Sequence, residues 1–294
     1  MLSLLGSKVL FDASAGISPG PPVKKETPMT SPKLVLCELP DPNLAGFESY
    51  SPFCMKVHRA LRLCGLPYER RFAANPEAFK HLNPAGQVPV LLVDGKAIAD
   101  STRIVSRLDA LSANALSRGL DARGRAEAFL WEEMADGVLA GFLVAARWID
   151  EDNWRKTKAA YFAGMPSVVR AIVPERIRRR IRGGLARDVI RPDLRTTWSN
   201  FQRILDELEV RAPSHGFWLG DSPSRADVAL FAQLHSFRTP LTLEQAGWVG
   251  ARTTLSAWLG RVDAASSSSL VTDAALDRPG EPARAATGVA VAFG

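Results

Sequence analysis

The order of short apolar runs and helical patterns between residues 34 and 111 constrains the fold of this chain more than any other feature. Runs of apolar and β-branched residues predict strands over residues 34–39, 68–72, 88–93 and 96–99. Apolar residues at helical spacing predict helices over residues 52–64, 77–82 and 101–111. Asp94-Gly95 is a two-residue hairpin signal, and Gly65 ends the first helix. The order βαβαββα predicts a small four-stranded sheet covered by helices.

The rest of the chain has no convincing strand after Leu111. Long amphipathic segments instead predict helices over residues 122–149, 154–163, 168–181, 194–209 and 226–237. The expected fold class is therefore an α/β domain followed by an all-α domain. We expect the α/β domain at 34–111, a linker at 112–119 and the helical domain at 120–264. Residues 265–294 are low in aromatic residues and predict a disordered tail.

Residues 1–33 predict a flexible leader and not a secretion signal. The apolar start is broken by Gly6, Ser7 and Lys8, whereas a signal peptide needs a continuous apolar stretch. Met29, just before the first strand, is a second candidate start. No run of about 20 uninterrupted apolar residues predicts a membrane span. Three cysteines and four scattered histidines predict neither a disulfide framework nor a metal site, and they favour a reducing cytoplasm.

The net charge of +6 is concentrated in one segment. Between Arg170 and Arg191 there are eight arginines and two acidic residues. Such a segment is either a solvated helix face or a contact surface for phosphate groups or anionic lipid. No aromatic residue alternates with these arginines to stack on bases, so we expect no nucleic-acid partner. Weak contact with an anionic membrane is the functional interpretation of this segment.

The segment Ser51-Pro52-Phe53-Cys54 opens the first predicted helix. Ser51 suits the N-cap and Pro52 the first helical position, which is a complete structural explanation of both. The functional interpretation is that the helix start attracts an anion, and that a thiolate held there accepts a hydrogen bond from Ser51. Cys54 is either a small core residue or a reactive thiol. Because Ser51 stands where a second cysteine would be needed, this motif cannot cycle through an internal disulfide.

Two further motifs flank the predicted hairpin. Val88–Pro89 stands at a strand entrance, where proline has no N–H to donate; a cis bond there would let the backbone of Val88 pair with an extended peptide. The alternative is an ordinary turn proline. Asp100-Ser101 follows the hairpin, where Ser101 is expected to cap the next helix and its backbone N–H can hold a carboxylate, while Asp100 can accept from an ammonium group. The alternative is a plain N-cap with an acid beside it.

At these motifs the chain resembles the cytosolic glutathione S-transferase superfamily. The first segment, similar to the omega- and zeta-type active-site helix, is SPFCMKVHRALRLCGLPYE. The second, similar to the glutathione-site block, is NPAGQVPVLLVDGKAIADSTRIVSRLD. The third, similar to an element of the helical domain in which Ser224 and Asp227 form a capping box, is FWLGDSPSRADVALFAQLHSF. The resemblance covers roughly residues 34–264, and the first segment with its long preceding loop also resembles the failed-axon-connections and metaxin-like branch.

The resemblance implies a thioredoxin-like N-terminal domain, an all-helical C-terminal domain and a role for each matching residue. Ser51 matches the catalytic residue, and Tyr50 beside it is a rival hydroxyl. Glutathione, the implied co-substrate, would be held by matching residues in four places, namely Asn75, Val88, Pro89 and the pair Asp100-Ser101. The family usually has Glu or Gln at the Asp100 position, and omega-type members have a basic side chain at the Asn75 position.

The implied function is transfer of the glutathione thiolate to a small electrophile, by a cytoplasmic homodimer. One alternative is a glutathione-dependent thiol transferase that acts through Cys54. Another is a non-catalytic binding or scaffold protein whose contact surface is the arginine segment. The aromatic residues that either line an electrophile pocket or belong to the core are Trp131, Trp148, Tyr161 and Phe162.

Overall fold

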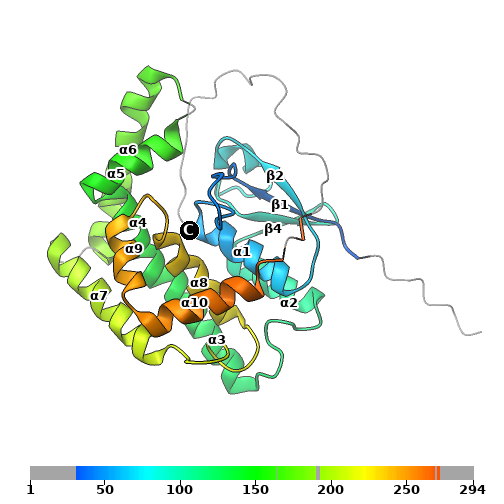
Figure 1. Ribbon diagram of the computed structural model, residues 1–294. Helices are drawn as coiled ribbons and strands as arrows, with labels where there is room; N and C mark the ends of the chain where they lie inside the picture. Colours follow the sequence, from blue (N-terminus) through cyan, green and yellow to red (C-terminus); the bar gives the residue numbers. More distant parts are fainter. Residues whose placement is uncertain (1–30, 164, 190–192, 269, 272–294) are drawn as a thin grey trace, which may run out of the picture. The chain divides into compact units, whose positions relative to one another are not determined.

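The computed structural model describes residues 31–163, 165–189, 193–268 and 270–271. Its strands are β1 (Leu34–Glu38), β2 (Glu69–Phe72), β3 (Val90–Val93) and β4 (Lys96–Ala99). They form one mixed sheet in the order β2-β1-β3-β4 (Figure 1). Strand β1 pairs parallel with β2 and antiparallel with β3, and β3 pairs antiparallel with β4. The predicted hairpin is the β3–β4 pair.

The two central strands are buried along their whole length. The helices of this part are α1 (Pro52–Leu63), the 3-10 helix η1 (Pro76–Phe79) and α2 (Ser101–Leu111). Leu34 and Leu36 of β1 pack in the cluster formed with α1 and α2, whereas Val35 and Cys37 pack on the other side with Phe79 of η1. Alternate residues of one strand thus fill two different layers.

The strand register brings the termini of three strands to one edge of the sheet, the edge that runs across the strand ends. Cys37 near the end of β1 lies beside Val90 at the start of β3, and Val90 lies beside Ala99 at the end of β4. The chain therefore leaves β1, enters β3 and leaves β4 at the same edge. The loop to the first helix, the Val-Pro motif and the Asp-Ser motif are all attached there.

Beyond α2 the described residues contain helices and no named strand. They are α3 (Ala122–Met134), the π-helical turn η2 (Ala135–Leu139), α4 (Ala140–Trp148), α5 (Glu151–Phe162), α6 (Ser167–Asp188), α7 (Leu194–Arg211), α8 (Arg225–Phe237), α9 (Leu243–Gly250) and α10 (Thr253–Ala265). In the part of the chain described, no helix is long and apolar enough to cross a bilayer.

Helix α8 is the centre of the helical part, with every residue from 226 to 237 buried, and it packs against both α1 and α3. Its start is fixed by Asp227, whose carboxylate accepts from the Ser224 N–H and hydroxyl, from the Trp218 N–H and from the indole N–H of Trp258. Burial raises the pKa of Asp227. The Ser224–Asp227 pair is therefore a folding element, as the sequence indicated.

The predicted fold class is confirmed: a thioredoxin-like α/β part with a four-stranded mixed sheet precedes an all-helical part. The order βαβαββα also agrees, with the expected helical turn over 77–82 reduced to η1. The prediction missed α9 and α10, and it read 122–149 as one helix where η2 interrupts it.

Residues 1–30 of the predicted leader (1–33), with the candidate start Met29, and most of the predicted tail (265–294) lie outside the described residues. The tail prediction differs from the structure at its beginning. Ala265 is the last residue of α10, and Tyr68 donates its N–H to Leu270 and forms a bridge with Val271. The domain limits at 111 and 120 remain predictions; the nearest helices end at Leu111 and begin at Ala122.

Candidate active site

Ser51 is the N-cap of α1, with Pro52 in the first turn. Its backbone is extended (φ −78°, ψ 120°), and its hydroxyl oxygen accepts from the Cys54 N–H at 3.3 Å. The Ser51 N–H in turn donates to the buried Ser49 hydroxyl at 3.2 Å. Ser51 itself is only half-buried. A polar hydroxyl and the positive end of the helix dipole therefore stand together at an accessible helix start.

The loop that leads to Ser51 is held by the helical part of the chain. Arg147 of α4, which is 3% exposed, donates to the Tyr50 carbonyl at 2.6 Å and to the Tyr161 hydroxyl at 3.0 Å. The Tyr50 and Tyr161 rings lie 5.4 Å apart, centroid to centroid. Further back, the Gly46 carbonyl accepts from His235 of α8. The position of Ser51 thus depends on residues about 100 to 190 positions away in the sequence.

Cys54 does not have the surroundings of a reactive thiol. Its side chain is 0% exposed and packs at the base of α1. Burial raises the pKa of the Cys54 thiol, and the nearby Glu38 carboxylate raises it further, against smaller opposing contributions from the Ser51 and Ser49 hydroxyls. A thiol whose pKa is raised in this way is protonated at neutral pH, and the thiol is not the nucleophilic form. The buried position therefore favours the core role of Cys54 over the reactive one.

A buried polar group lies behind Cys54. Glu38, at the end of β1, accepts from His58 Nε2 at 3.0 Å and from Arg70 Nε at 2.7 Å. His58 Nδ1 lies 2.6 Å from the Tyr68 hydroxyl, and burial raises the pKa of Tyr68 to about 12. His58 is fully buried. It therefore serves the structure of the α/β part and not the chemistry at Ser51.

Asp100 and Ser101 form the start of α2. Asp100 is the N-cap, and its carboxylate accepts from the Arg103 N–H at 2.9 Å. Its φ of +79° is unusual for a residue with a side chain, and strain of this kind is concentrated at functional sites. The prediction that Ser101 is the N-cap is wrong by one residue: Ser101 occupies the first helical position and is 6% exposed. The helix start therefore offers free N–H groups beside an exposed carboxylate.

A buried cation connects the two helix starts. Lys56, five residues after Ser51, is 0% exposed and donates from Nζ to Thr102 Oγ1 at 3.1 Å and Ser101 Oγ at 3.5 Å. Glu132 and Asp136 each pair with its ammonium group at 2.5 Å. The helix that begins at Ser51 therefore contacts the start of α2 through a residue of its second turn.

Lys56 and Asp136 were not singled out from the sequence. Lys56 could have been noticed as a charged residue between the apolar positions Met55 and Val57. Asp136 could not, because it faces Lys56 through the π-helical turn η2, and turns of this kind leave no clear sequence signal.

The Val88–Pro89 bond is cis, as the functional interpretation of that motif required. Val88 lies before the first paired residue of β3, so sheet pairing does not use its backbone. Asn75 precedes η1 and makes no side-chain cap there. Asn75 follows the outer strand β2, whereas Asp100 follows β4, the outer strand on the opposite side of the sheet. The segments that carry Ser51, Val88 and Ser101 are attached to β1, β3 and β4 at the same edge.

The aromatic candidates are mostly core. Trp148 and Phe162 are at most 1% exposed and pack together beneath α5, and Trp131 packs edge to face on Trp218. Only Tyr161 reaches the loop before Ser51. Burial raises the pKa of the Tyr161 hydroxyl, against a smaller opposing effect of Arg147.

Comparison with known families matches both parts of this arrangement. A family model described as the glutathione S-transferase N-terminal domain matches residues 52–153, and one described as the glutathione S-transferase C-terminal domain matches residues 175–261. Together they cover well over half of the chain. The chain belongs to the glutathione S-transferase superfamily.

Individual members give the same picture. Protein LigF from Sphingobium sp. is 25% identical over 232 residues, which are 68% of this chain and 81% of LigF. The crystal structure of that beta-etherase superposes with a TM-score of 0.56 at 24% identity, over 79% of this chain and 95% of LigF. A glutathione transferase family member from Pseudomonas fluorescens, with two glutathione molecules bound, has a TM-score of 0.53 at 16% identity, over 78% and 87% of the two chains. At these identities the two structures establish the fold alone.

Failed axon connections from Drosophila melanogaster is 36% identical over 77 residues, 26% of this chain. The match spans only 18% of the Drosophila protein.

Glutathione is the co-substrate of the superfamily, and crystal structures of relatives contain bound glutathione.

Proposed function

We propose that this chain is a glutathione transferase that joins the glutathione sulfur to a small electrophile, with Ser51 as the catalytic residue. The observation that carries the proposal is the accessible Ser51 hydroxyl at the N-terminus of α1, on the sheet edge that also presents Val88 and Ser101. Family membership supports the same assignment.

The residues at this edge fit glutathione in three places. Ser101 and the start of α2 suit the γ-glutamyl carboxylate, and Asp100 suits its ammonium group. Lys56 favours the donor role of Ser101, because an ammonium group on the oxygen of a hydroxyl leaves the O–H to donate outward. The backbone of Val88, outside the sheet pairing, suits the cysteinyl part of a peptide in β-like pairing. Asn75 stands apart from these groups, and we assign it at most a contact with the far end of glutathione.

The chemistry follows from the position of Ser51. The glutathione S–H gives its proton to solvent, and the thiolate is stabilised by the Ser51 O–H and the dipole of α1. The thiolate sulfur then forms a bond to the electrophilic carbon, and the leaving group departs with the electron pair of the bond that breaks. Tyr50 precedes Ser51, and Arg147 fixes its backbone by donating to the Tyr50 carbonyl. The Tyr50 hydroxyl is the second candidate donor to the thiolate.

The glutathione site is tested by calorimetric titration with reduced glutathione. We expect binding that weakens about ten- to a hundredfold in Ser101→Ala, since a hydrogen bond to a charged group contributes about 1.5–3 kcal/mol. Ser106→Ala, also in α2 but exposed, is the matched control and should bind normally. No binding to the folded wild-type protein contradicts the proposal.

The role of Ser51 is tested by the thiol pKa of bound glutathione, followed through the ultraviolet absorbance of the thiolate. We expect a bound thiol more acidic than the free one, and a return toward the free value in Ser51→Ala with glutathione affinity little changed. Each tenfold change in thiol acidity corresponds to about 1.4 kcal/mol. If Tyr50→Phe removes the effect and Ser51→Ala does not, the donor is Tyr50 and our assignment is wrong.

The electrophile, the assembly and the location complete the proposal. One relative is named a beta-etherase, so ethers are the electrophiles to test first. A homodimer is supported by an exposed apolar face on α3 and η2, where Phe129, Leu130 and Val138 are 42%, 66% and 41% exposed. A reducing cytoplasm is supported by the three free cysteines, Cys37, Cys54 and Cys64.

A further inference from the structure

The arginine segment has two different sides. Arg178 is 8% exposed and points inward, where it donates to the Trp148 and Ile149 carbonyls at 2.7 and 3.0 Å and pairs with Glu151 at 2.7 Å. It holds the end of α4 and takes no part in a surface. The arginines of α6 that are exposed are Arg170, Arg176, Arg179, Arg180 and Arg182.

The outward face of α6 combines these arginines with exposed aliphatic residues. Val168 and Ile172, which are 72% and 51% exposed, stand at four-residue spacing from each other and from Arg176, and Arg179 continues the row. Arg180 lies beside it. We call Val168, Ile172, Arg176, Arg179 and Arg180 the α6 stripe. The opposite side of the helix is anchored by Pro174, Ile177, Ile181 and Leu185, so the stripe has a fixed direction.

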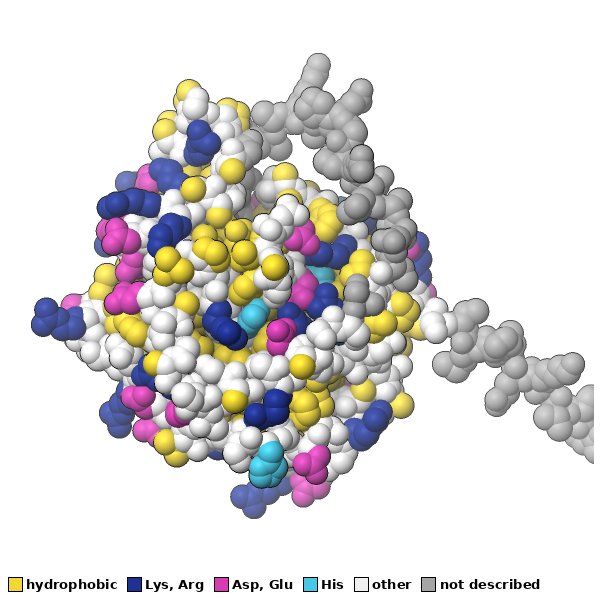
Figure 2. Space-filling model, in the orientation of Figure 1, with side chains coloured by type: hydrophobic (Ala, Val, Ile, Leu, Met, Phe, Trp, Pro, Cys, Tyr) yellow, Lys and Arg dark blue, Asp and Glu magenta, His cyan; other side chains and the backbone are white. Residues whose placement is uncertain are grey.

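The stripe is cationic without internal neutralisation. Within the described part of the chain, no carboxylate pairs with Arg176, Arg179 or Arg180. Two acids of this region are engaged elsewhere: Glu175 of α6 pairs with Lys158 at 3.0 Å, and Glu151 of α5 pairs with Arg178. In Figure 2, dark blue Lys and Arg side chains lie over α5 and α6 together with yellow apolar ones.

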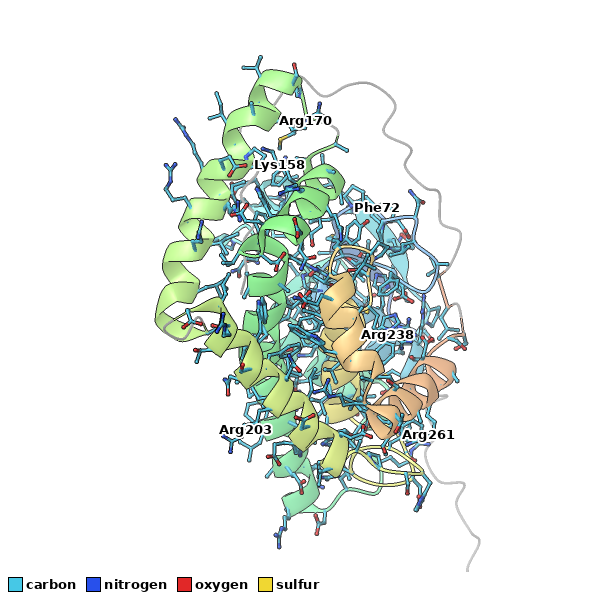
Figure 3. The ribbon with its side chains drawn as sticks, turned by 60° about the vertical axis from the view of Figure 1, so that its left-hand side comes forward. Phe72, Lys158, Arg170, Arg203, Arg238 and Arg261 are labelled. Carbon is cyan, nitrogen blue, oxygen red and sulfur yellow. The ribbon has the colours of Figure 1, made fainter. Side chains whose placement is uncertain are left out.

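A recess adjoins the N-terminal end of the stripe. It has a volume of about 470 Å³ and lies between α5 and α6, and its polar lining consists of Arg155, Lys158, Ser167 and Arg170 over a floor of three alanines. Figure 3 shows Lys158 and Arg170 near each other at this end of the molecule. Lys158 pairs with Glu175 and Arg155 with Asp152, so among the described residues Arg170 is the cation of this recess that pairs with no carboxylate. Its guanidinium suits a phosphate-bearing group.

We propose that the α6 stripe docks on an anionic lipid surface, with its guanidinium groups at headgroup phosphates and Val168 and Ile172 in the interfacial layer. We choose a negatively charged partner because the exposed guanidinium groups of the stripe are positively charged. The two exposed aliphatic residues favour lipid over nucleic acid, since they gain by leaving water in the interface, and the stripe has no aromatic ring to stack on bases. The surface is separate from the glutathione site, and the proposal does not depend on the transferase reaction.

The test is co-sedimentation of the full chain with vesicles of phosphatidylcholine alone and of phosphatidylcholine mixed with phosphatidylserine. We expect binding only to the anionic vesicles, lost at about 1 M salt, where screening acts within about 3 Å. Reversing the charge at Arg176, Arg179 and Arg180 to Glu should weaken partitioning by on the order of a hundredfold or more, at about fivefold per arginine removed. Val168→Ser with Ile172→Ser should weaken it without any change in charge.

The matched control reverses three exposed arginines on other elements, Arg107→Glu, Arg203→Glu and Arg238→Glu. Figure 3 shows Arg203 and Arg238 well away from Arg170. This control variant should partition to the anionic vesicles only a few-fold more weakly than the wild type. Circular dichroism should show that all variants are folded. Equal losses in the two triple variants would mean attraction by net charge alone and would overturn the docking surface. So would absence of binding to anionic vesicles at low salt, or binding to RNA oligonucleotides in its place.

Discussion

At the scale of single residues, this fold buries ionic groups where the candidate site is assembled. Lys56 and Arg147 are almost completely buried and both connect the α/β part to the helical part, Lys56 through Asp136 and Arg147 through the Tyr50 carbonyl. Breaking such a buried pair leaves an uncompensated charge, which is far more costly than losing a surface pair. The loop before Ser51 is fixed by a third group, His235 of α8, which lies between the Phe47 and Phe231 rings at centroid distances of 4.3 and 4.7 Å.

The stability of the protein should therefore depend on His235 in mild acid. Burial lowers the pKa of His235 from its ordinary 6.5, against a smaller opposing effect of its hydrogen bond to Gly46. As pH falls, the unfolded chain therefore protonates His235 at a higher pH than the folded chain does. The free energy of unfolding decreases as pH falls from about 6.5 toward the folded-state pKa. Each tenfold difference in proton affinity corresponds to about 1.4 kcal/mol.

The measurement is the free energy of unfolding in urea at about pH 7.5 and about pH 5. The decrease in the free energy of unfolding between these two pH values should be smaller in His235→Gln than in the wild type. His215→Gln, which changes an exposed histidine, should leave the loss unchanged. The same loss in all three proteins would exclude His235 as its source.

At the scale of elements, the arginines of α6 have two different roles, one inside the fold and one at the surface. Its inward Arg178 satisfies the last carbonyls of α4, which have no partner inside their own helix, while its outward arginines contact solvent. Spacing separates the two sets, because residues 178 and 179 point about 100° apart around the helix axis. Arg178 thus adds polar contacts to the apolar packing of Ile177, Ile181 and Leu185 that joins α6 to α4.

Neighbouring arginines of α6 should consequently differ strongly when replaced. Arg178→Ala removes charge-assisted hydrogen bonds to two carbonyls and should lower the free energy of unfolding by about 2–3 kcal/mol. Arg179→Ala, at an exposed position, should change it by no more than about 0.5 kcal/mol. Urea unfolding of the two variants beside the wild type decides this, and similar losses in both would contradict the inward role of Arg178.

At the scale of the whole molecule, several apolar side chains are exposed along α3 and η2. Phe129 and Leu130 of α3 and Val138 of η2 are exposed, and Phe129 lies under the Arg225 guanidinium at 5.7 Å. Contiguous apolar surface of this kind marks interaction sites on soluble domains. A second copy of the chain is the occupant we propose.

Leu130→Glu should then convert dimers to monomers, because a buried charge without a partner opposes association. Sedimentation velocity at several protein concentrations measures this directly. Val210→Glu is the control, since Val210 is 85% exposed on α7 and lies on a different element. A wild-type monomer, or a dimer that survives Leu130→Glu, would show that this face is not the dimer interface.

The sequence by itself determined the features whose causes are local. The hairpin at Asp94-Gly95, the N-cap role of Ser51, the start of α2 after Asp100 and the order βαβαββα all follow from turn chemistry and from periodicity within a few residues. Because a helix start attracts anions wherever it occurs, the candidate positions Ser51 and Ser101 also follow from the amino-acid order alone.

Only the tertiary structure decided which groups meet. The burial of Cys54, the pairing of Lys56 with Asp136, the inward position of Arg178 and the bridge from Tyr68 to Val271 each depend on contacts between residues far apart in the sequence. Sequence periodicity tells which side of a helix is buried but not what lies against it. Charged residues on apolar faces are therefore understood only when their partners are in place, since burial costs energy that a specific neighbour must offset.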